Sequence, residues 1–135
     1  MDYIDMSDAQ RRQTIQTLAN AYINAWSTTD AAVRRDLVAR VYADEAEFFS
    51  AEDGNLRLQG RLDIAANIGQ VNERDIQGHG LAIEHRATTI NHRAVKVTWQ
   101  MVSSEGGVAL TGMNLLLLNS SGEIAQDFIF IGSPN

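Results

Sequence analysis

The chain contains no cysteine and a single proline, Pro134, which stands near the end of its 135 residues. The lack of cysteine excludes a disulfide framework, a zinc site built on thiolates and a cysteine nucleophile, and it fits a reducing compartment. The longest run of leucines, 115 to 118, is far too short to span a bilayer. The acidic start of the chain has no apolar core, so we expect no secretory signal, no membrane partner and a cytoplasmic location.

Positive charge is also in deficit, because 11 Lys and Arg stand against 17 Asp and Glu for a formal net charge of -6. This balance argues against nucleic acid or an anionic membrane as a partner. Hydrophobic residues make up 44% and charged residues 21%, the composition of an ordinary globular protein. The length predicts one domain over residues 1–135.

The first half of the chain predicts three helices from apolar residues at helical spacing. Ser7 and Gln10 have the spacing of a capping box, and Asp30 offers an N-cap for the second helix. The third helix follows Gly60, and Tyr22 lies on the apolar face of the first. The remaining expectations are Val41 and Tyr42 on the second helix, a short strand over 47–50, a turn at 52–55 and a polar loop over 72–80.

The second half predicts four consecutive strands separated by turns, with no helix between Leu81 and Gly132. In one strand Val95, Val97, Trp99 and Met101 alternate with polar residues, which indicates a single buried face. The stretch 108–118 is largely apolar on both faces, so we expect helices or a pocket on one face and a homodimer contact on the other. The whole predicts an α+β fold in which a curved, mostly antiparallel sheet wraps around three N-terminal helices and encloses a pocket.

The order of elements and several local stretches resemble the nuclear transport factor 2-like superfamily, and within it the SnoaL-like bacterial proteins related to polyketide cyclases and ketosteroid isomerase. The stretches that carry the resemblance are residues 25–30 (AWSTTD), 41–46 (VYADEA), 91–93 (NHR), 111–114 (TGMN) and 121–124 (SGEI). The resemblance covers nearly the whole chain and implies the cone-shaped, cystatin-like fold of that superfamily. It implies no cofactor.

The resemblance also assigns roles to single residues. Tyr22 falls where ketosteroid isomerase places an oxyanion-hole tyrosine, and Asn114 falls where it places a protonated aspartic acid, so both positions keep a hydrogen-bond donor. The general base is missing, because the expected aspartate position holds Ser50. A standard ketosteroid isomerase mechanism is therefore not expected. SnoaL-like cyclases use an acidic residue on the late strands, and Asp127 resembles it.

The residues around Asp127 support that assignment independently. Its partners by strand alternation are Ala125, Ile129 and Ile131, all apolar. A carboxyl group on an apolar face has a raised pKa, as a general acid/base working near neutral pH requires. Alternation does not say which face is inner, so Asp127 on the exposed convex face stays the alternative.

We predict a pocket whose polar tips are the catalytic candidates Asp127, Tyr22 and Asn114. Its ligand-binding wall is predicted to comprise Phe48, Trp99, Met101 and Ile129, with His85 pointing inward as a second proton carrier. The alternatives are a satisfied core tyrosine at 22, a structural amide at 114 and a core tryptophan at 99. The three histidines do not share a metal-binding spacing, so no metal is expected. The acidic residues 44, 45 and 47 are expected in a solvated turn.

Three functional hypotheses follow. The first is a cofactor-independent isomerase, cyclase or lyase that acts on a hydrophobic, carbonyl-bearing small molecule, with Asp127 moving the proton and Tyr22 and Asn114 stabilising the oxyanion. The second is a non-catalytic module that binds an apolar ligand. The third is a dimerisation domain with a vestigial cavity. Whether the chain is an enzyme stays open at this stage, and the discriminating observation is an open cavity with Asp127 near Tyr22.

Overall fold

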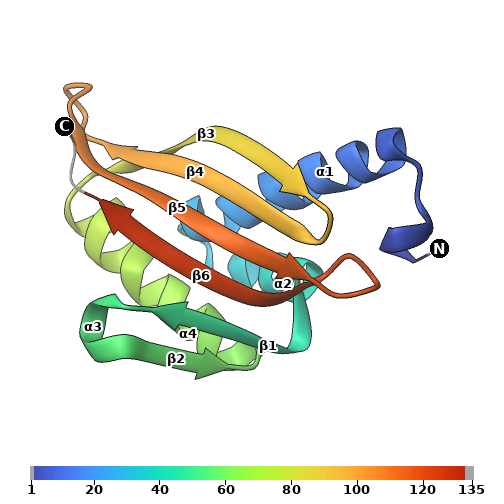
Figure 1. Cartoon of the computed structure of the whole chain (residues 1–135). Helices are drawn as coiled ribbons and strands as arrows, with labels where there is room; N and C mark the ends of the chain where they lie inside the picture. Colours follow the sequence, from blue (N-terminus) through green and yellow to red (C-terminus); the bar gives the residue numbers. More distant parts are fainter. Residues whose placement is uncertain (1, 133–135) are drawn as a thin grey trace.

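The computed structural model describes residues 2–132, apart from the side chain of Asp53. Helices precede most of the strands, and Figure 1 shows a single layer of strands crossing in front of them. The helical elements are η1 (Tyr3–Asp5), α1 (Asp8–Ser27), α2 (Ala31–Val41), α3 (Glu52–Asn55), α4 (Arg61–Val71) and the π-helical η2 (Asn72–Gly78). The strands are β1 (Tyr42–Ser50), β2 (Leu56–Gln59), β3 (Ala82–Asn91), β4 (Ala94–Val102), β5 (Val108–Leu118) and β6 (Ile124–Gly132).

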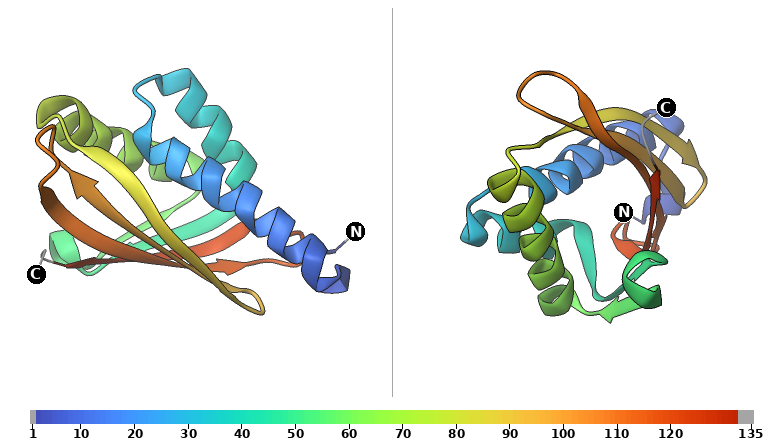
Figure 2. Two further views of the ribbon diagram at one scale, coloured as in Figure 1. Left: turned by 90° about the horizontal axis from the view of Figure 1, so that it is seen from above. Right: turned by 90° about the vertical axis from the view of Figure 1, so that its left-hand side faces the viewer.

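The six strands form one sheet in the order β2-β1-β6-β5-β4-β3. All neighbours pair antiparallel except β1 and β6, which are parallel. Figure 2 shows the sheet bending around the helices, which lie on its concave side. The expected α+β cone is therefore confirmed. The sheet is mixed through the β1–β6 pair alone, because β1 enters from the helical half of the chain and joins the edge of the later meander.

The helix starts follow the sequence signals. The Ser7 hydroxyl accepts a hydrogen bond from the Gln10 amide at 3.1 Å, and the Gln10 side chain accepts from the Ser7 amide at 2.9 Å. Asp30 accepts from the backbone amides of Ala32 and Val33 at the start of α2. These bonds satisfy amide groups that have no partner inside the helix, so both caps stabilise their helices.

Three local expectations are wrong. Tyr42 is the first residue of β1 rather than part of the second helix, and the turn expected at 52–55 is the short helix α3. The strand β2 that follows α3 was not predicted. The segment expected as a loop continues α4 as the π-helical η2. Although this segment is mostly polar, its Asn72 side chain is fully buried. The Asn72 amide donates to the Trp26 carbonyl at 2.8 Å and accepts from Gln77 at 2.8 Å.

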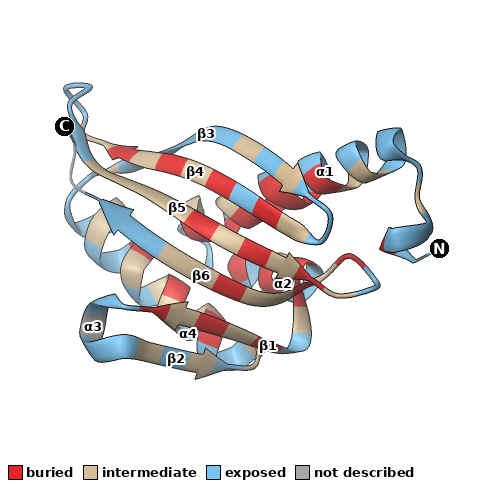
Figure 3. Cartoon of the chain, viewed as in Figure 1, coloured by how far each residue is buried: buried red, intermediate tan, exposed pale blue. Residues whose placement is uncertain are grey.

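The core lies between the helices and the inner faces of the central strands. Figure 3 shows buried residues on α1, β1, β4 and β5, alternating with less buried ones along the strands. The predicted inner face of β4 is confirmed, because Val95, Val97, Trp99 and Met101 are all buried. This concave face, together with α1 and α4, positions the candidate site.

Candidate functional site

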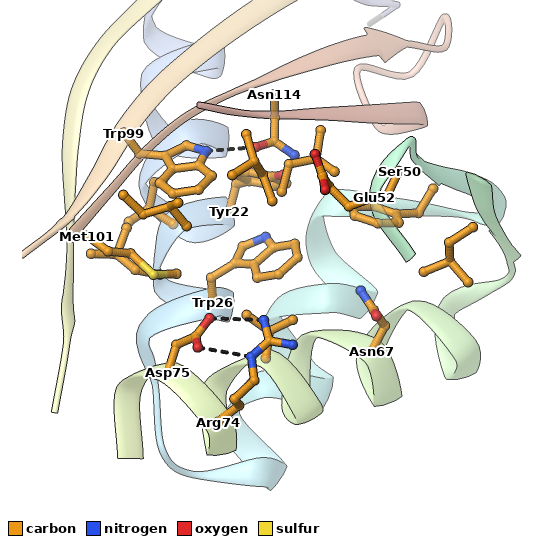
Figure 4. Close-up of a pocket in the computed structure, with 18 residues that line it drawn as sticks. Tyr22, Trp26, Ser50, Glu52, Asn67, Arg74, Asp75, Trp99, Met101 and Asn114 are labelled. Carbon is orange, nitrogen blue, oxygen red and sulfur yellow. Dashed lines mark hydrogen bonds and ion pairs between the residues drawn. The ribbon is translucent and has the colours of Figure 1, made fainter. Parts of the chain in front are cut away.

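A cavity opens between α1 and the concave face of the sheet. Four aromatic side chains give it an apolar wall: Tyr22, Trp26, Phe48 and Trp99. The cavity offers about 80 Å³, several times the roughly 10–15 Å³ that a single water requires. Figure 4 shows Trp26 in the middle of the space, with Trp99, Met101 and Asn114 on the sheet side.

Charged groups stand at one end of the cavity. Arg74 and Asp75, both from η2, form a two-pronged ion pair with distances of 3.0 and 3.1 Å, which is drawn in Figure 4. Glu52 and Asn67 also line the cavity, from α3 and α4. Figure 4 shows Glu52 beside Ser50, away from Arg74 and Asp75, so polar groups stand at separate places around the apolar body of the cavity.

Asp127 lies on β6 and has no exposed surface. Its Oδ2 accepts hydrogen bonds from the hydroxyls of Tyr22 and Tyr42, both at 2.7 Å, and its Oδ1 accepts from the Asn114 amide nitrogen at 2.8 Å. The expectation that Asp127 belongs to the inner face is thus supported by its position. Asp127 nevertheless does not line the cavity, because Tyr22 and Asn114 form the wall there. The expected place of Asp127 in the cavity wall is therefore wrong, and Asp127 reaches the cavity only through Tyr22 and Asn114.

The orientation of Asn114 follows from Trp99. The indole nitrogen of Trp99 is a donor only, and it contacts the Asn114 Oδ1 at 2.8 Å. The amide nitrogen of Asn114 must therefore face Asp127. The hydrogen bonds therefore run in one direction: Trp99 donates to Asn114, and Asn114 donates to the carboxyl group of Asp127.

Burial raises the pKa of Asp127 to about 6 from its ordinary value of 3.8, while hydrogen bonds from Tyr42, Asn114 and Tyr22 act in the opposite direction. Burial also raises the pKa of Tyr22 and of Tyr42 well above the usual range, and the nearby Asp127 charge adds to both shifts. The carboxyl group can therefore exchange a proton near neutral pH, whereas both tyrosines stay protonated. A group of this kind is suited to acid/base work.

The structure brings together most of the residues expected at the site. Six of them line the cavity: Tyr22, Phe48, Trp99, Met101, Asn114 and Ile129. The inward position expected for His85 is wrong, because its side chain is exposed and its Nε2 lies 2.7 Å from the Thr88 hydroxyl. The register of β3 shifts between His85 and Ala87, and β3 is an edge strand of the sheet. Strand alternation alone could not have found this irregularity.

Other residues of the site were missed from the sequence, and two of them are Tyr42 and Trp26. Tyr42 was placed on a helix, although its even-numbered spacing from Phe48 and Ser50 on one strand was a usable signal. Trp26 was not among the residues expected at the site, and it lines the cavity. Ser50, where the sequence resemblance places the base of ketosteroid isomerase, is buried and also lines the cavity.

The acidic residues 44, 45 and 47 lie on β1 rather than in a turn. Asp44 pairs with Arg61, and Glu47 pairs with Arg57 at 2.6 Å. Within residues 2–132, no group of three histidine or acidic side chains is arranged to hold a metal ion. In the same range, no helix is both long and apolar enough to cross a membrane.

Comparison with solved structures supports the same fold. A candidate isomerase of the SnoaL-like family from Agrobacterium tumefaciens superposes with a TM-score of 0.75 at 23% identity, covering 90% of this chain and 99% of that one. An NTF2-like protein from Mesorhizobium loti gives 0.66 at 12% identity and 96% coverage of both chains. A candidate polyketide cyclase from Sinorhizobium meliloti gives 0.62 at 18% identity, covering 96% of this chain and 100% of that one. No protein-family model matches the sequence, and no curated protein sequence is significantly similar to it.

Proposed function

We propose that the chain binds a compact, mostly apolar compound carrying a carbonyl group and converts it by acid/base chemistry without a cofactor, as an isomerase, cyclase or lyase. One observation carries the proposal. A hydroxyl in the cavity wall, that of Tyr22, lies 2.7 Å from a fully buried carboxyl group, that of Asp127. Because the pKa of Asp127 is raised to about 6, this pair can pass a proton near neutral pH.

The proposed step runs through Tyr22 as a relay. The Tyr22 oxygen takes a proton from a carbon next to the ligand carbonyl, while the Tyr22 hydrogen passes to Oδ2 of Asp127. The electron pair of the broken C–H bond moves into the enolate. Reversal of the relay at a different carbon returns the proton, so an isomerisation is balanced without any added reactant. Tyr22 is never left ionised, which agrees with its raised pKa.

The similar structures include a candidate isomerase and a candidate polyketide cyclase. At 23% and 18% identity they share the fold with this chain, and they support the class of reaction only by analogy. The mostly aromatic wall supports a ring-shaped ligand, because flat apolar compounds pack well against aromatic side chains.

A second candidate function is binding without turnover. Two observations favour it: Asp127 does not line the cavity, and Ser50 occupies the position of the missing base. A serine hydroxyl does not take a proton from carbon near neutral pH without a base of its own. The two candidates differ in whether a bound ketone exchanges protons with solvent.

The test uses two matched variants, since Tyr22 and Tyr42 both donate to the same oxygen of Asp127 but only Tyr22 lines the cavity. The probe is a small cyclic β,γ-unsaturated ketone such as cyclohex-3-enone. Its conversion to the conjugated isomer is followed by absorbance, and deuterium uptake in D₂O by NMR. We expect Tyr22→Phe and Asp127→Asn to lower the rate by roughly two to four orders of magnitude.

The control is Tyr42→Phe, which should keep the rate within about tenfold. Because a hydrogen bond from Tyr42 lowers the pKa of Asp127, its removal should shift the pH profile upward. Equal losses in both tyrosine variants would contradict the relay. Binding of the ketone without isomerisation or deuterium uptake above the buffer rate would support the binding module instead.

A further inference from the structure

Most hydrogens of the residues expected to hold a ligand carbonyl already form hydrogen bonds within the protein. The Tyr22 hydroxyl has one hydrogen, and it points to Asp127. The Trp99 indole also has one, and it points to Asn114. One amide hydrogen of Asn114 goes to Asp127 as well. While Asp127 is ionised, the Tyr22 and Trp99 hydrogens are not free for a ligand oxygen.

Among the described residues of the cavity wall, one buried nitrogen makes no hydrogen bond. The indole nitrogen of Trp26 is buried and makes no hydrogen bond, and Trp26 as a whole is only 7% exposed. Among residues 2–132, Arg11 and Arg34 also contain a buried nitrogen without a partner, but neither residue lines the cavity. In Figure 4 the Trp26 nitrogen faces the side of the cavity where Tyr22 and Asn114 lie.

We propose that the Trp26 indole N–H is the anchor for the ligand's carbonyl oxygen, so that the cavity selects compounds bearing an oxygen acceptor over hydrocarbons of the same shape. The inference rests on the proposed function, and it names the group that the ligand must present. A buried N–H without a partner is costly in the empty protein, and an oxygen acceptor removes that cost. A hydrocarbon fills the same space and leaves the N–H without a partner.

The position of Trp26 also suits the reaction. Tyr22 and Trp26 are four residues apart on α1, so they lie on the same face of the helix, and their ring centroids are 6.4 Å apart. A carbonyl held at Trp26 therefore has its neighbouring carbons directed toward Tyr22. A donor at the carbonyl oxygen stabilises the negative charge that develops when a proton leaves an adjacent carbon.

Entry of the ligand requires a small adjustment. The Trp26 nitrogen has almost no exposed surface in the empty cavity, so neighbouring side chains must shift to let an oxygen reach it. Phe48 packs at a ring-centroid distance of 6.0 Å from Trp26, at an angle of 42°. Substitution of Phe48 changes the apolar wall without touching any hydrogen-bonding group, which makes it a suitable control position.

The test compares cyclohexanone with methylenecyclohexane, which have nearly the same shape and differ in the acceptor oxygen. The chain has two tryptophans, so an NMR spectrum of ¹⁵N-labelled protein contains two indole N–H signals. We expect cyclohexanone to move the Trp26 signal downfield and to move the Trp99 signal little, because the Trp99 hydrogen is already bound to Asn114. Methylenecyclohexane should not produce the downfield shift.

Two variants complete the design. Trp26→Phe should weaken cyclohexanone binding about tenfold, the worth of one hydrogen bond, and should change methylenecyclohexane binding much less. Phe48→Leu should weaken both compounds by a similar factor. In both variants Trp99 remains as a fluorescent reporter of binding.

The outcomes separate this inference from the proposed function. If cyclohexanone binds but the Trp26 signal stays in place, or if Trp26→Phe weakens both compounds equally, the Trp26 anchor is wrong and the binding function stands. If the selectivity is found but no ketone is isomerised or takes up deuterium, the anchor stands and catalysis is wrong. If neither compound binds up to its solubility limit, the cavity is not a site for this class and both proposals are overturned.

Discussion

Asp127 is a carboxyl group without any contact to water, and three hydrogen bonds replace only part of the hydration it has lost. Its pKa of about 6 in the folded chain lies above the ordinary value of 3.8. At a pH between these two pKa values, Asp127 holds a proton in the folded protein and has released it in the unfolded chain. Folding stability from this group is therefore present at low pH and is lost as pH rises through the folded pKa.

This linkage gives a prediction for the stability of the protein. The shift from 3.8 to about 6 corresponds to about 3 kcal/mol. We expect the free energy of unfolding of the parent, relative to Asp127→Asn, to fall by up to that amount between pH 4 and pH 7. Urea titrations at several pH values measure it. Curves of the two proteins that run parallel across this range would contradict the burial effect.

The substitution has a second, pH-independent effect. In Asp127→Asn the amide oxygen can still accept from Asn114, which Trp99 holds in orientation, and the amide N–H groups then face the two tyrosine hydroxyls. The tyrosine hydroxyl hydrogens lose their acceptor, and a buried donor without a partner costs about 1–3 kcal/mol. We expect the variant to be no more stable than the parent at neutral pH. The carboxyl group is identified by the pH dependence of the free energy of unfolding, which the parent shows and the variant lacks.

Single residues were predicted to different degrees. The burial of Asp127 was expected from its apolar alternation partners, and Asn114 was placed at the site by the resemblance. The hydrogen bonds among Asp127, Tyr22 and Tyr42 span 85 and 105 residues of sequence. No local pattern indicates such pairs, and Tyr42 was missed because its strand spacing was assigned to the preceding helix.

At the scale of elements, β4 and β5 hold the site through a close contact between Trp99 and Gly112. The two residues are partners in the register of the strands. A Cβ atom built on Gly112 would lie 2.1 Å from the Trp99 ring, so a larger residue there forces the indole to move. The glycine is therefore required by Trp99, which in turn orients Asn114.

We predict that Gly112→Ala destabilises the protein by about 1–3 kcal/mol, the usual cost of overpacking. It should also weaken the Trp99–Asn114 hydrogen bond, which the Trp99 indole N–H signal reports. Thermal unfolding compares it with Gly107→Ala, since a Cβ on Gly107 meets only an ordinary contact at 3.5 Å from Ser103. Equal melting temperatures for the two variants would show that the sheet absorbs the added methyl group.

The elements that the sequence predicted well are those with strong local signals. The range 108–118 is the strand β5, and the caps at Ser7 and Asp30 begin α1 and α2. The π-helical segment was missed because a buried amide, Asn72, fixes it and its composition is polar. The parallel pairing of β1 with β6 was missed because it joins residues about 80 positions apart.

At the scale of the whole molecule, the outer face of the sheet carries an apolar patch on β5, β6 and β1, and the helices lie on the other side of the sheet. Leu115 and Phe128 are partners in the register of β5 and β6, and Phe128 stacks on Phe49 of β1 at 4.8 Å between ring centroids. Phe130, on the same strand, is 55% exposed. Patches of this kind on a sheet mark association surfaces. The sequence already indicated such a surface, because residues 108–118 are largely apolar on both faces of the strand.

We predict a homodimer through this face, with a mass near twice the 14.9 kDa of one chain by light scattering at micromolar concentration. A specific pair requires roughly 1,000 Å² or more of buried surface. Phe128→Glu places a charge at the centre of the apolar patch and should give a monomer, because a buried charge without a partner strongly disfavours association.

Val33→Glu is the matched control, since Val33 is an apolar residue of α2 that is 44% exposed and does not belong to the sheet. A monomer mass for the parent at micromolar concentration would refute the dimer, and a dimer mass for Phe128→Glu would place the contact elsewhere.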